Sequence, residues 1–250
     1  MISVKTAHEV ELMRQAGRIA ATALALGGAA VKPGVTTAQI DKIIHDYIVS
    51  QGAKPNFLGL YGFPASACIS VNDTVIHGIP TRSQVIREGD IVSIDTGALY
   101  KGWHSDNAGT FIAGEGSEEA KRLIQVTTQS FYEGIKMAVV GNRVGDISHA
   151  IQQYVEANGF SVVREFVGHG LGRELHEDPE VPNWGTAGRG ARLVAGMTLA
   201  IEPMVNAGGA AVRTMPDGWA VKTKDGSLSA HFERSIVITA KGPVILTDPE

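Results

Sequence analysis

Apolar residues recur at helical spacing in four segments of the chain. Their periodicity predicts helices over residues 7–30, 36–52, 117–138 and 144–158. Thr36 and Asp146 stand near two of the predicted starts, where short polar side chains cap free backbone N–H groups. Gly52 and Gly159 stand at two predicted ends, where glycine readily takes the left-handed conformation that closes a helix.

Shorter segments rich in Val, Ile, Thr and Phe follow each pair of helices. Turn residues separate them, as is typical of strands. We predict strands over residues 67–72, 91–98, 107–112, 161–166, 197–206, 210–215 and 230–238. The order of two helices followed by several strands therefore occurs twice along the chain.

A faint internal repeat agrees with that order. When the sequence is shifted by 107 residues, Gly52 falls on Gly159, and Gly-Asp-Ile-Val-Ser-Ile-Asp (89–95) falls on Gly-Met-Thr-Leu-Ala-Ile-Glu (196–202). The segment 104–106 resembles 231–233 at a longer separation of 127, which indicates an insertion in the second half. We expect two related halves, roughly 1–113 and 114–250, that share one sheet and one core in a single domain over 1–250.

Composition and charge exclude several classes of protein. Of the 250 residues, 44% are hydrophobic, which excludes a disordered chain. The net charge of −4 indicates no basic stripe for sequence-specific binding of nucleic acid. The apolar run 19–31 is too short to span a membrane, and the single cysteine fits a reducing compartment. We expect a cytoplasmic protein without membrane association.

Two aspartates stand in neighbouring predicted strands. If Lys101 and Gly102 form the two-residue turn of a hairpin, residue 95 faces residue 108, and Asp106 has the same parity as residue 108. Asp95 and Asp106 then lie diagonally on one face of the sheet. They are either solvated strand carboxylates or a pair that needs a cation or a shared proton.

The second half repeats this pattern with glutamates. Glu202 ends an apolar run, and Glu233 precedes another. If the halves are related by a pseudo-twofold axis, all four carboxylates meet at that axis. A buried carboxylate is costly unless it is paired, and two divalent cations would balance four negative charges. The sequence therefore favours a dinuclear metal site, on the condition that these strands are buried.

His169 is the candidate nitrogen ligand. Glycines on both sides of it indicate a tight backbone and an exposed imidazole, although a lone histidine is more often structural. Imidazole and carboxylates without thiolate suit Mn, Fe, Co or Zn better than Ca or Mg. On pattern alone, the roles of His77 and His176 stay open, and Cys68 and Trp219 read as core residues.

Several motifs together resemble one family. The segment FVGHGLGRELHEDPEVPNW (166–184) is similar to the signature of the type I methionine aminopeptidases, and the match extends through IVSID (91–95), IEPMVN (201–206) and DGWAVKTKD (217–225). The resemblance covers almost the whole chain. It implies an α+β "pita-bread" fold, in which two pseudo-symmetric halves form a curved antiparallel sheet covered by helices on its outer side.

The resemblance also implies functional residues. The family's metal ligands fall on Asp95, Asp106, His169, Glu202 and Glu233, and its two histidines near the scissile bond fall on His77 and His176. Its methionine pocket falls on Phe63, Cys68 and Trp219, which match or come close, and on Phe57, Leu60 and Leu175, which depart from the cysteine, tyrosine and phenylalanine of the best-known bacterial members. We expect the pocket to stay apolar and to hold a thioether.

The implied activity is hydrolytic removal of the initiator methionine from nascent proteins with a small second residue. Two divalent ions would activate the attacking water, with catalytic roles for His77, His176 and Glu202. We expect a monomer that meets nascent N-termini near the ribosome. Two alternatives share the fold: a non-catalytic binding module, and a proline-directed metallopeptidase. Members of the latter group usually carry an extra N-terminal domain.

Overall fold

The helices form where the apolar periodicity predicts them. The computed structural model describes residues 2–248, within which the four α-helices are α1 (Ala7–Ala29), α2 (Thr37–Ser50), α3 (Glu118–Ile135) and α4 (Val144–Ala157). The Thr36 side chain caps α2, and the Asp146 carboxylate accepts the Arg143 N–H at the start of α4. Gly52 and Gly159 follow α2 and α4 at φ of +71° and +79°. These capping predictions are confirmed.

A nine-stranded sheet forms the centre of the molecule. Its main path runs β1–β4–β5–β14–β9–β7–β8, with β2 also paired to β4 and β15 to β14. The strands are β1 (Lys54–Pro55), β2 (Ala67–Val71), β4 (Ile91–Tyr100), β5 (Trp103–Ile112), β7 (Gly168–Gly170), β8 (Glu177–Val181), β9 (Thr198–Ile201), β14 (Glu233–Thr239) and β15 (Gly242–Ile245). The pairings between them are antiparallel.

Two smaller sheets flank the central one. The first has the order β13–β10–β6 and contains β6 (Ser161–Val162), β10 (Met204–Asn206) and β13 (Ser229–His231). The second has the order β11–β12–β3 and contains β3 (Thr74–Ile76), β11 (Val212–Thr214) and β12 (Val221–Thr223).

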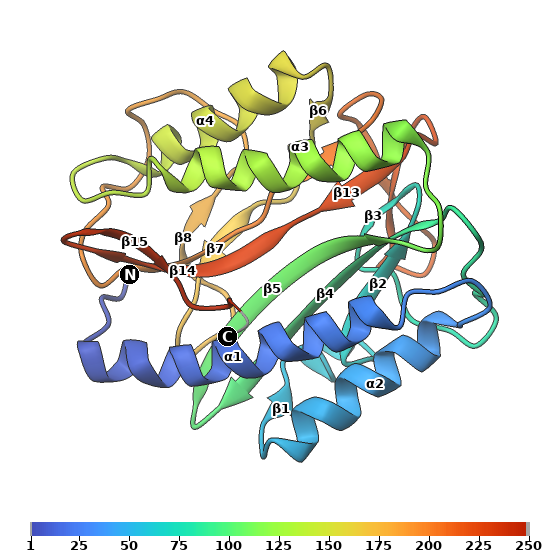
Figure 1. The fold of residues 1–250 in the computed structure, drawn as a ribbon. Coiled ribbons are helices and arrows are strands. Elements are labelled where there is room, and N and C mark those ends of the chain that lie inside the picture. Colours follow the sequence, from blue (N-terminus) through green and yellow to red (C-terminus); the bar gives the residue numbers. More distant parts are fainter. Residues whose placement is uncertain (1, 249–250) are drawn as a thin grey trace.

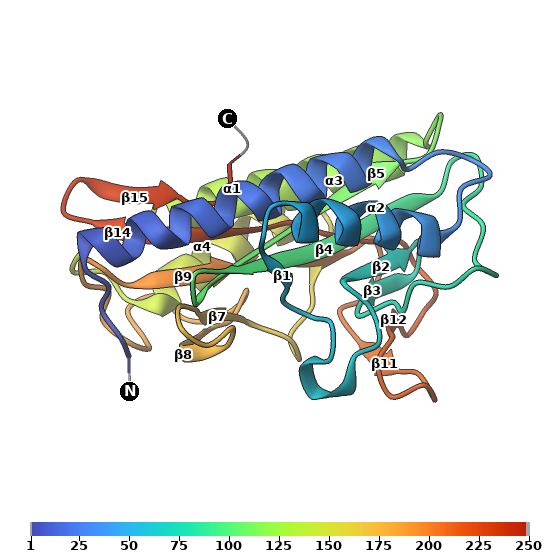
Figure 2. The ribbon, with the colours of Figure 1, turned by 90° about the horizontal axis from the view of Figure 1, so that it is seen from below.

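The two halves meet at the pairing of β5 with β14. Figure 1 shows α1 and α2 beside the strands of the first half, and α3 and α4 beside those of the second. In Figure 2 the helices lie along the upper side of the sheet, whereas its edge strands β7 and β8, together with β11 and β12 of a smaller sheet, extend below. The expected layers are therefore present: helices outside, one shared curved sheet, and an inner face that the helices leave open.

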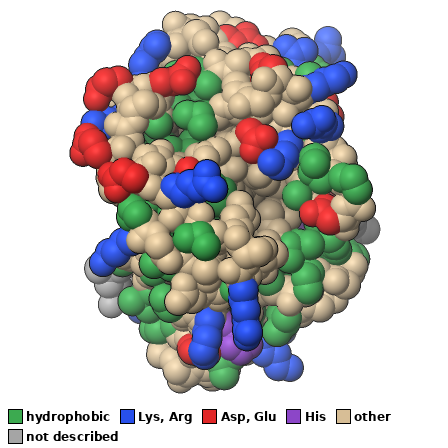
Figure 3. Space-filling model, turned by 90° about the vertical axis from the view of Figure 1, so that its right-hand side faces the viewer, with side chains coloured by type: hydrophobic (Ala, Val, Ile, Leu, Met, Phe, Trp, Pro, Cys, Tyr) green, Lys and Arg blue, Asp and Glu red, His purple; other side chains and the backbone are tan. Residues whose placement is uncertain are grey.

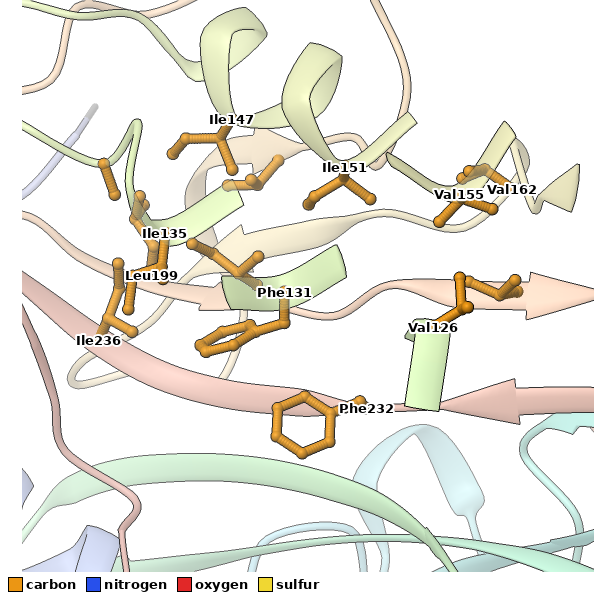
Figure 4. Packing of buried hydrophobic residues seen from close by; sticks show 14 of the residues in the cluster. Val126, Phe131, Ile135, Ile147, Ile151, Val155, Val162, Leu199, Phe232 and Ile236 are labelled. Carbon is orange, nitrogen blue, oxygen red and sulfur yellow. The ribbon is translucent and has the colours of Figure 1, made fainter. Parts of the chain in front are cut away.

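Two apolar cores attach the helices to the sheet. In the first half, Val92 and Ile94 of β4 pack with Ile40 and Ile44 of α2. In the second half, Phe131 of α3 packs with residues of α4 and the sheet, a cluster that Figure 4 shows around Ile147, Ile151, Leu199, Phe232 and Ile236. Successive strand residues point to opposite faces, so the residues between these core positions point to the inner face.

The structure differs from the predicted strands where the chain changes sheet. Residues 197–206 form two strands, β9 and β10, interrupted at Glu202 and Pro203, because proline has no N–H for a ladder. Residues 230–238 are likewise divided into β13 and β14 at Phe232. The predicted ranges also omit six strands: β1, β3, β7, β8, β12 and β15. For β7 and β8 the reason is plain, since a Gly-His-Gly segment and a segment containing Pro179 lack the alternating pattern of strands.

The surface agrees with the charge balance of the sequence. Figure 3 shows one face of the molecule, on which basic and acidic side chains are interspersed. Among residues 2–248, no helix is long and apolar enough to cross a bilayer.

Candidate metal centre and pocket

One row of side chains crosses the inner face of the sheet. Cys68 on β2 pairs with Asp95 on β4, and Asp95 pairs with Ala108 on β5. Ala108 pairs in turn with Glu233 on β14. Glu202 directly follows β9, next to Ile201, which pairs with Arg234. The row therefore brings together Asp95 of β4, Glu233 of β14 and Glu202 at the end of β9.

A second row runs parallel to the first, two residues along each strand. Asp106 on β5 donates its N–H to Ser235 Oγ (3.0 Å), and that hydroxyl donates to the Asp106 carbonyl (2.8 Å). Ser235 pairs with Ala200, which pairs with His169 on β7. Residues two apart share a face, so both rows open to the same side. The predicted diagonal placement of Asp95 and Asp106 is confirmed by the register Asp95–Ala108.

The side chains of these rows converge. Ligand atoms of Asp106, His169 and Glu233 all lie within 4.8 Å of one another, an arrangement that could hold a metal ion. His169 Nε2 lies 3.9 Å from Asp106 Oδ2 and 3.7 Å from Glu202 Oε1. Because Ala108, Ser235 and Ala200 are small, they leave room between the converging groups.

The environment of these carboxylates calls for a positive charge. Asp95 Oδ1, Asp106 Oδ1 and Glu233 Oε1 are buried, and each lacks a hydrogen-bond donor within residues 2–248. Burial, together with repulsion from neighbouring carboxylates, raises the pKa values of Asp95, Glu202 and Glu233 well above their usual range. Burial also raises the pKa of Asp106, to about 7. Such a donor set fits a divalent cation, which would satisfy the orphaned oxygens.

His169 corrects one expectation. We expected an exposed imidazole, but the residue is only 9% exposed. Its flanking glycines instead allow the neighbouring strands to approach the backbone of β7 closely. A Cβ on Gly168 would collide with the carbonyl of Ala200, and one on Gly170 with that of Asp178. Glycine at these positions lets β7 fit between β9 and β8, which brings the imidazole to the carboxylates.

A pocket of about 520 Å³ opens above the carboxylates. It is lined by predicted site residues, namely Phe57, Leu60, Phe63, Cys68, His77, Asp95, Asp106, His169, His176, Glu202, Trp219 and Glu233. Its apolar side is one cluster, in which Phe63 and Trp219 pack edge to face with ring centroids 5.1 Å apart. Leu175 is buried in this cluster and is not among the residues that line the pocket. Burial raises the pKa of Cys68, so its thiol stays neutral and apolar.

Two histidines flank the opening. His77 takes a left-handed backbone conformation (φ 59°), and its ring meets those of Phe166 and Trp219 edge on. His176 meets His169 edge on, with centroids 4.5 Å apart. Burial lowers the pKa of His77 to about 4 and also lowers that of His176. Both rings are therefore neutral near pH 7 and can each donate one hydrogen bond.

Sequence reasoning missed several residues around this site. His231 is buried with Nε2 3.8 Å from Glu202 Oε2, and the Asn183 amide donates to the Glu202 carbonyl (3.0 Å). Lys5 forms a buried ion pair with Glu177 (2.6 Å), the residue that follows His176. Tyr61 lies at the rim, stacked on His176. The 104–106 and 231–233 match could have pointed to His231; no pattern pointed to Tyr61 or Lys5.

Comparisons with known proteins agree with this geometry. The family model of metallopeptidase family M24 matches residues 11–240. A methionine aminopeptidase of Clostridium perfringens is 58% identical over 99% of both chains, and methionine aminopeptidase 1 of Bacillus subtilis is 50% identical over 99% of both. The chain belongs to the methionine aminopeptidases of family M24. The resemblance to the type I enzymes, the enzyme class and the assignment as a metallopeptidase are thereby confirmed.

Solved structures of the family share the fold. The methionine aminopeptidase of Thermotoga maritima superposes with a TM-score of 0.98 at 47% identity, covering 99% of this chain and 100% of that one. The prolidase of Pyrococcus horikoshii matches with a TM-score of 0.77 at 22% identity, covering 99% of this chain and 64% of its own. The latter likeness concerns the fold alone. The predicted pita-bread architecture is confirmed.

Proposed function

We propose that this chain hydrolyses the peptide bond after an N-terminal methionine. The observation that carries the proposal is the direct junction of an apolar pocket with a carboxylate and imidazole cluster: Cys68 belongs to the pocket and pairs with Asp95 of the cluster. A methionine side chain fits the apolar part, where its thioether can pack against Phe63 and Trp219. The bond that follows the methionine then lies at the cluster.

Five side chains would hold two divalent ions: Asp95, Asp106, His169, Glu202 and Glu233. Mn, Fe, Co or Zn suits this mixture of imidazole and carboxylates without thiolate. Ions bound here would lower the pKa of water enough to supply a nucleophile at neutral pH and would stabilise charge on the attacked carbonyl. The orphaned oxygens of three of these carboxylates support the assignment.

The protein's own groups supply the remaining steps. The neutral His176 ring, at the mouth beside His169, donates a hydrogen bond to the carbonyl oxygen as negative charge develops there. His77, on the pocket wall beside Trp219, orients the scissile amide nitrogen. Glu202, a carboxylate of the cluster that lines the pocket, carries a proton from water towards the leaving amine.

The substrate would be the N-terminus of a newly made protein. Its free α-amino group would bind one of the ions, which limits cleavage to the first residue. We infer that the chain works as a cytoplasmic monomer near the ribosome, with residues 1–250 as one catalytic unit.

The second residue of the substrate provides the test. Its side chain must fit between the carboxylate cluster and His77, so Gly, Ala or Ser is accepted, and Leu or Lys is rejected by steric clash. Apolar burial alone would favour the larger side chain. We expect a much higher kcat/KM for Met-Ala-Ser than for Met-Leu-Ser or Met-Lys-Ser. Similar values for all three peptides would refute the proposal.

The same assay separates the two alternatives. A proline-directed peptidase would cleave Ala-Pro peptides in preference to Met-Ala-Ser, and a binding module would cleave neither. Metal analysis of protein isolated without added metal then gives the number and identity of the ions.

A further inference from the structure

A strained turn carries an exposed aromatic ring at the pocket mouth. The 3₁₀ turn Leu60–Gly62 holds Tyr61 at φ 50°, between Gly59 and Gly62, which also have positive φ. A bulky residue in this region costs free energy that glycine or asparagine would largely avoid. The Tyr61 side chain buries little in return, because the residue is 78% exposed. Packing within the chain therefore does not explain a tyrosine here.

The turn is fixed at both sides of Tyr61. Leu60 and Phe63 belong to the apolar cluster of the pocket, and the N–H of Gly62 donates to the carbonyl of Gly59 (3.2 Å). Tyr61 itself lines the pocket. This turn thus holds the Tyr61 ring at the mouth of the pocket, where the ring faces solvent that a bound substrate would displace.

Three rings lead from the carboxylates to solvent. His176 meets His169 edge on at 4.5 Å, and the exposed Tyr61 ring stacks with His176 at 6.3 Å and an interplanar angle of 13°. An extended peptide advances about 3.3 Å per residue. The distance from one ring to the next therefore corresponds to one to two substrate residues. Tyr61 then lies beside the part of the substrate that follows the cleaved bond.

We propose that Tyr61 is a specificity-determining residue that binds the substrate backbone and side chains downstream of the second residue. This inference rests on the proposed function, since it takes the cleaved bond to lie at the carboxylates. The ring offers a flat apolar face to the departing polypeptide and lies nearly parallel to the His176 ring, with centroids 6.3 Å apart. The partner it recognises is an extended peptide of at least three residues; a dipeptide ends before it reaches the ring.

The test uses substrates of graded length. In Tyr61→Asn the side chain tolerates the left-handed backbone but lacks the ring, and Tyr61→Gly removes the strain as well. For both variants we expect kcat/KM for Met-Ala-Ser-Ala to fall about threefold to tenfold, the range for loss of an aromatic contact. For Met-Ala, which does not reach the ring, kcat/KM should change less than about twofold, because no aromatic contact is lost. Tyr61→Phe should match the original protein on both substrates.

Lys101→Asn is the matched control, because Lys101 also has a positive φ (51°) but lies in the β4–β5 turn. It should leave both substrates unaffected. An equal loss on the two substrates in Tyr61→Asn would show that the ring acts only through His176 and would overturn the inference, as would no loss at all. If the unmodified protein cleaved neither peptide, the proposed function itself would fail, which is a separate result.

Discussion

The two halves of the molecule have the same arrangement of helices and strands but carry different functional side chains. Each contributes two helices and a pair of strands with two carboxylates on the inner face. The first half uses the short side chains Asp95 and Asp106 on an unbroken hairpin of two ten-residue strands. The second half uses the longer Glu202 and Glu233 at breaks where the chain passes into a smaller sheet. It also carries His169 and His176 on the segment 166–184, whose counterpart at the shift of 107, residues 59–77, lines the pocket instead.

This difference shows that the internal symmetry accounts for the carboxylates but not for the pocket or for His176. The register of β5 with β14 pairs Ala108 with Glu233, while the hydrogen bonds of Ser235 join it to Asp106. A twofold axis exchanges these two pairs, so duplication alone places the carboxylates. A methionine pocket and a donor to one carbonyl are needed only once. They come from equivalent segments whose sequences have diverged: the 57–68 segment supplies the pocket in the first half, and the 166–184 segment supplies His176 in the second.

The largest expected effect tests whether the equivalent carboxylates are equally necessary. Asp106→Ala and Glu233→Ala should each remove at least one bound ion and reduce turnover to near background, because the remaining carboxylates are left uncompensated. Metal analysis and kcat for Met-Ala-Ser measure both effects. Asp46→Ala, an exposed carboxylate on α2, serves as the control. Full activity with two ions in either variant would contradict the ligand assignment.

The next effect concerns a histidine that the repeat does not duplicate, since Ile69 stands at the equivalent position. His176→Ala should lower kcat by roughly 10²–10³, as expected for loss of a donor to a developing oxyanion. KM should change little, since the contact forms in the transition state. Steady-state kinetics on Met-Ala-Ser provides the measurement. A variant that raised KM alone would instead assign His176 to ground-state binding.

The third prediction concerns the anchor of the His176 segment. Lys5→Met breaks the buried pair with Glu177 and should lower the free energy of unfolding by up to about 3 kcal/mol. Although burial raises the pKa of Glu177, hydrogen bonds from Lys5 and Ser3 outweigh it and lower that pKa below its ordinary value of 4.5. A carboxyl with a lowered pKa contributes stability above its unfolded pKa and loses it as the pH falls through the folded value.

The cost of Lys5→Met should therefore shrink as the pH falls below about 4.5 towards the folded pKa. Denaturant unfolding at a series of pH values measures it. Lys42→Met breaks an exposed pair with Asp46 and should cost under about 1 kcal/mol. Equal costs for the two variants would show that Lys5 is no special anchor.

The smallest effect compares one position in both halves. Gly52 and Gly159 end α2 and α4 at positive φ, and a Cβ added at either position would meet no atom within 4 Å. Gly52→Ala and Gly159→Ala should each destabilise the protein by about 1 kcal/mol, because alanine disfavours the left-handed region. Thermal unfolding of each variant tests this. Costs that differ severalfold would mean that the two helix ends are not structurally equivalent.

The sequence could predict those parts of the site that depend on local regularity. A two-residue turn at Lys101–Gly102 determines the register of a long hairpin, so the diagonal of Asp95 and Asp106 followed from counting. Glu202 was harder to place, because Pro203 divides a run that reads as one strand. His169 was predicted to be exposed, since its glycines could equally mark a loop; only the packing of β7 between β9 and β8 shows why they are needed.

Residues that act through distant contacts gave no signal in the sequence. Lys5 and Glu177 are 172 positions apart, and their pairing depends on how the N-terminal segment crosses the second half. Tyr61 breaks a local backbone preference, which becomes visible only once its φ is known. The family resemblance supplied the pocket residues, which no local pattern in the sequence indicates.

The position of β14 also has consequences for the order of events during synthesis. In space it lies between β5 and β9, but in chain order every other strand of the central sheet except β15 precedes it. A growing polypeptide that lacks β14 has two unpaired edges where the middle of the sheet should be, and such edges invite wrong partners. Its two halves cannot yet share a cation. Translation must therefore pass Glu233 before the first turnover is possible, and early metal uptake by an incomplete chain is disfavoured.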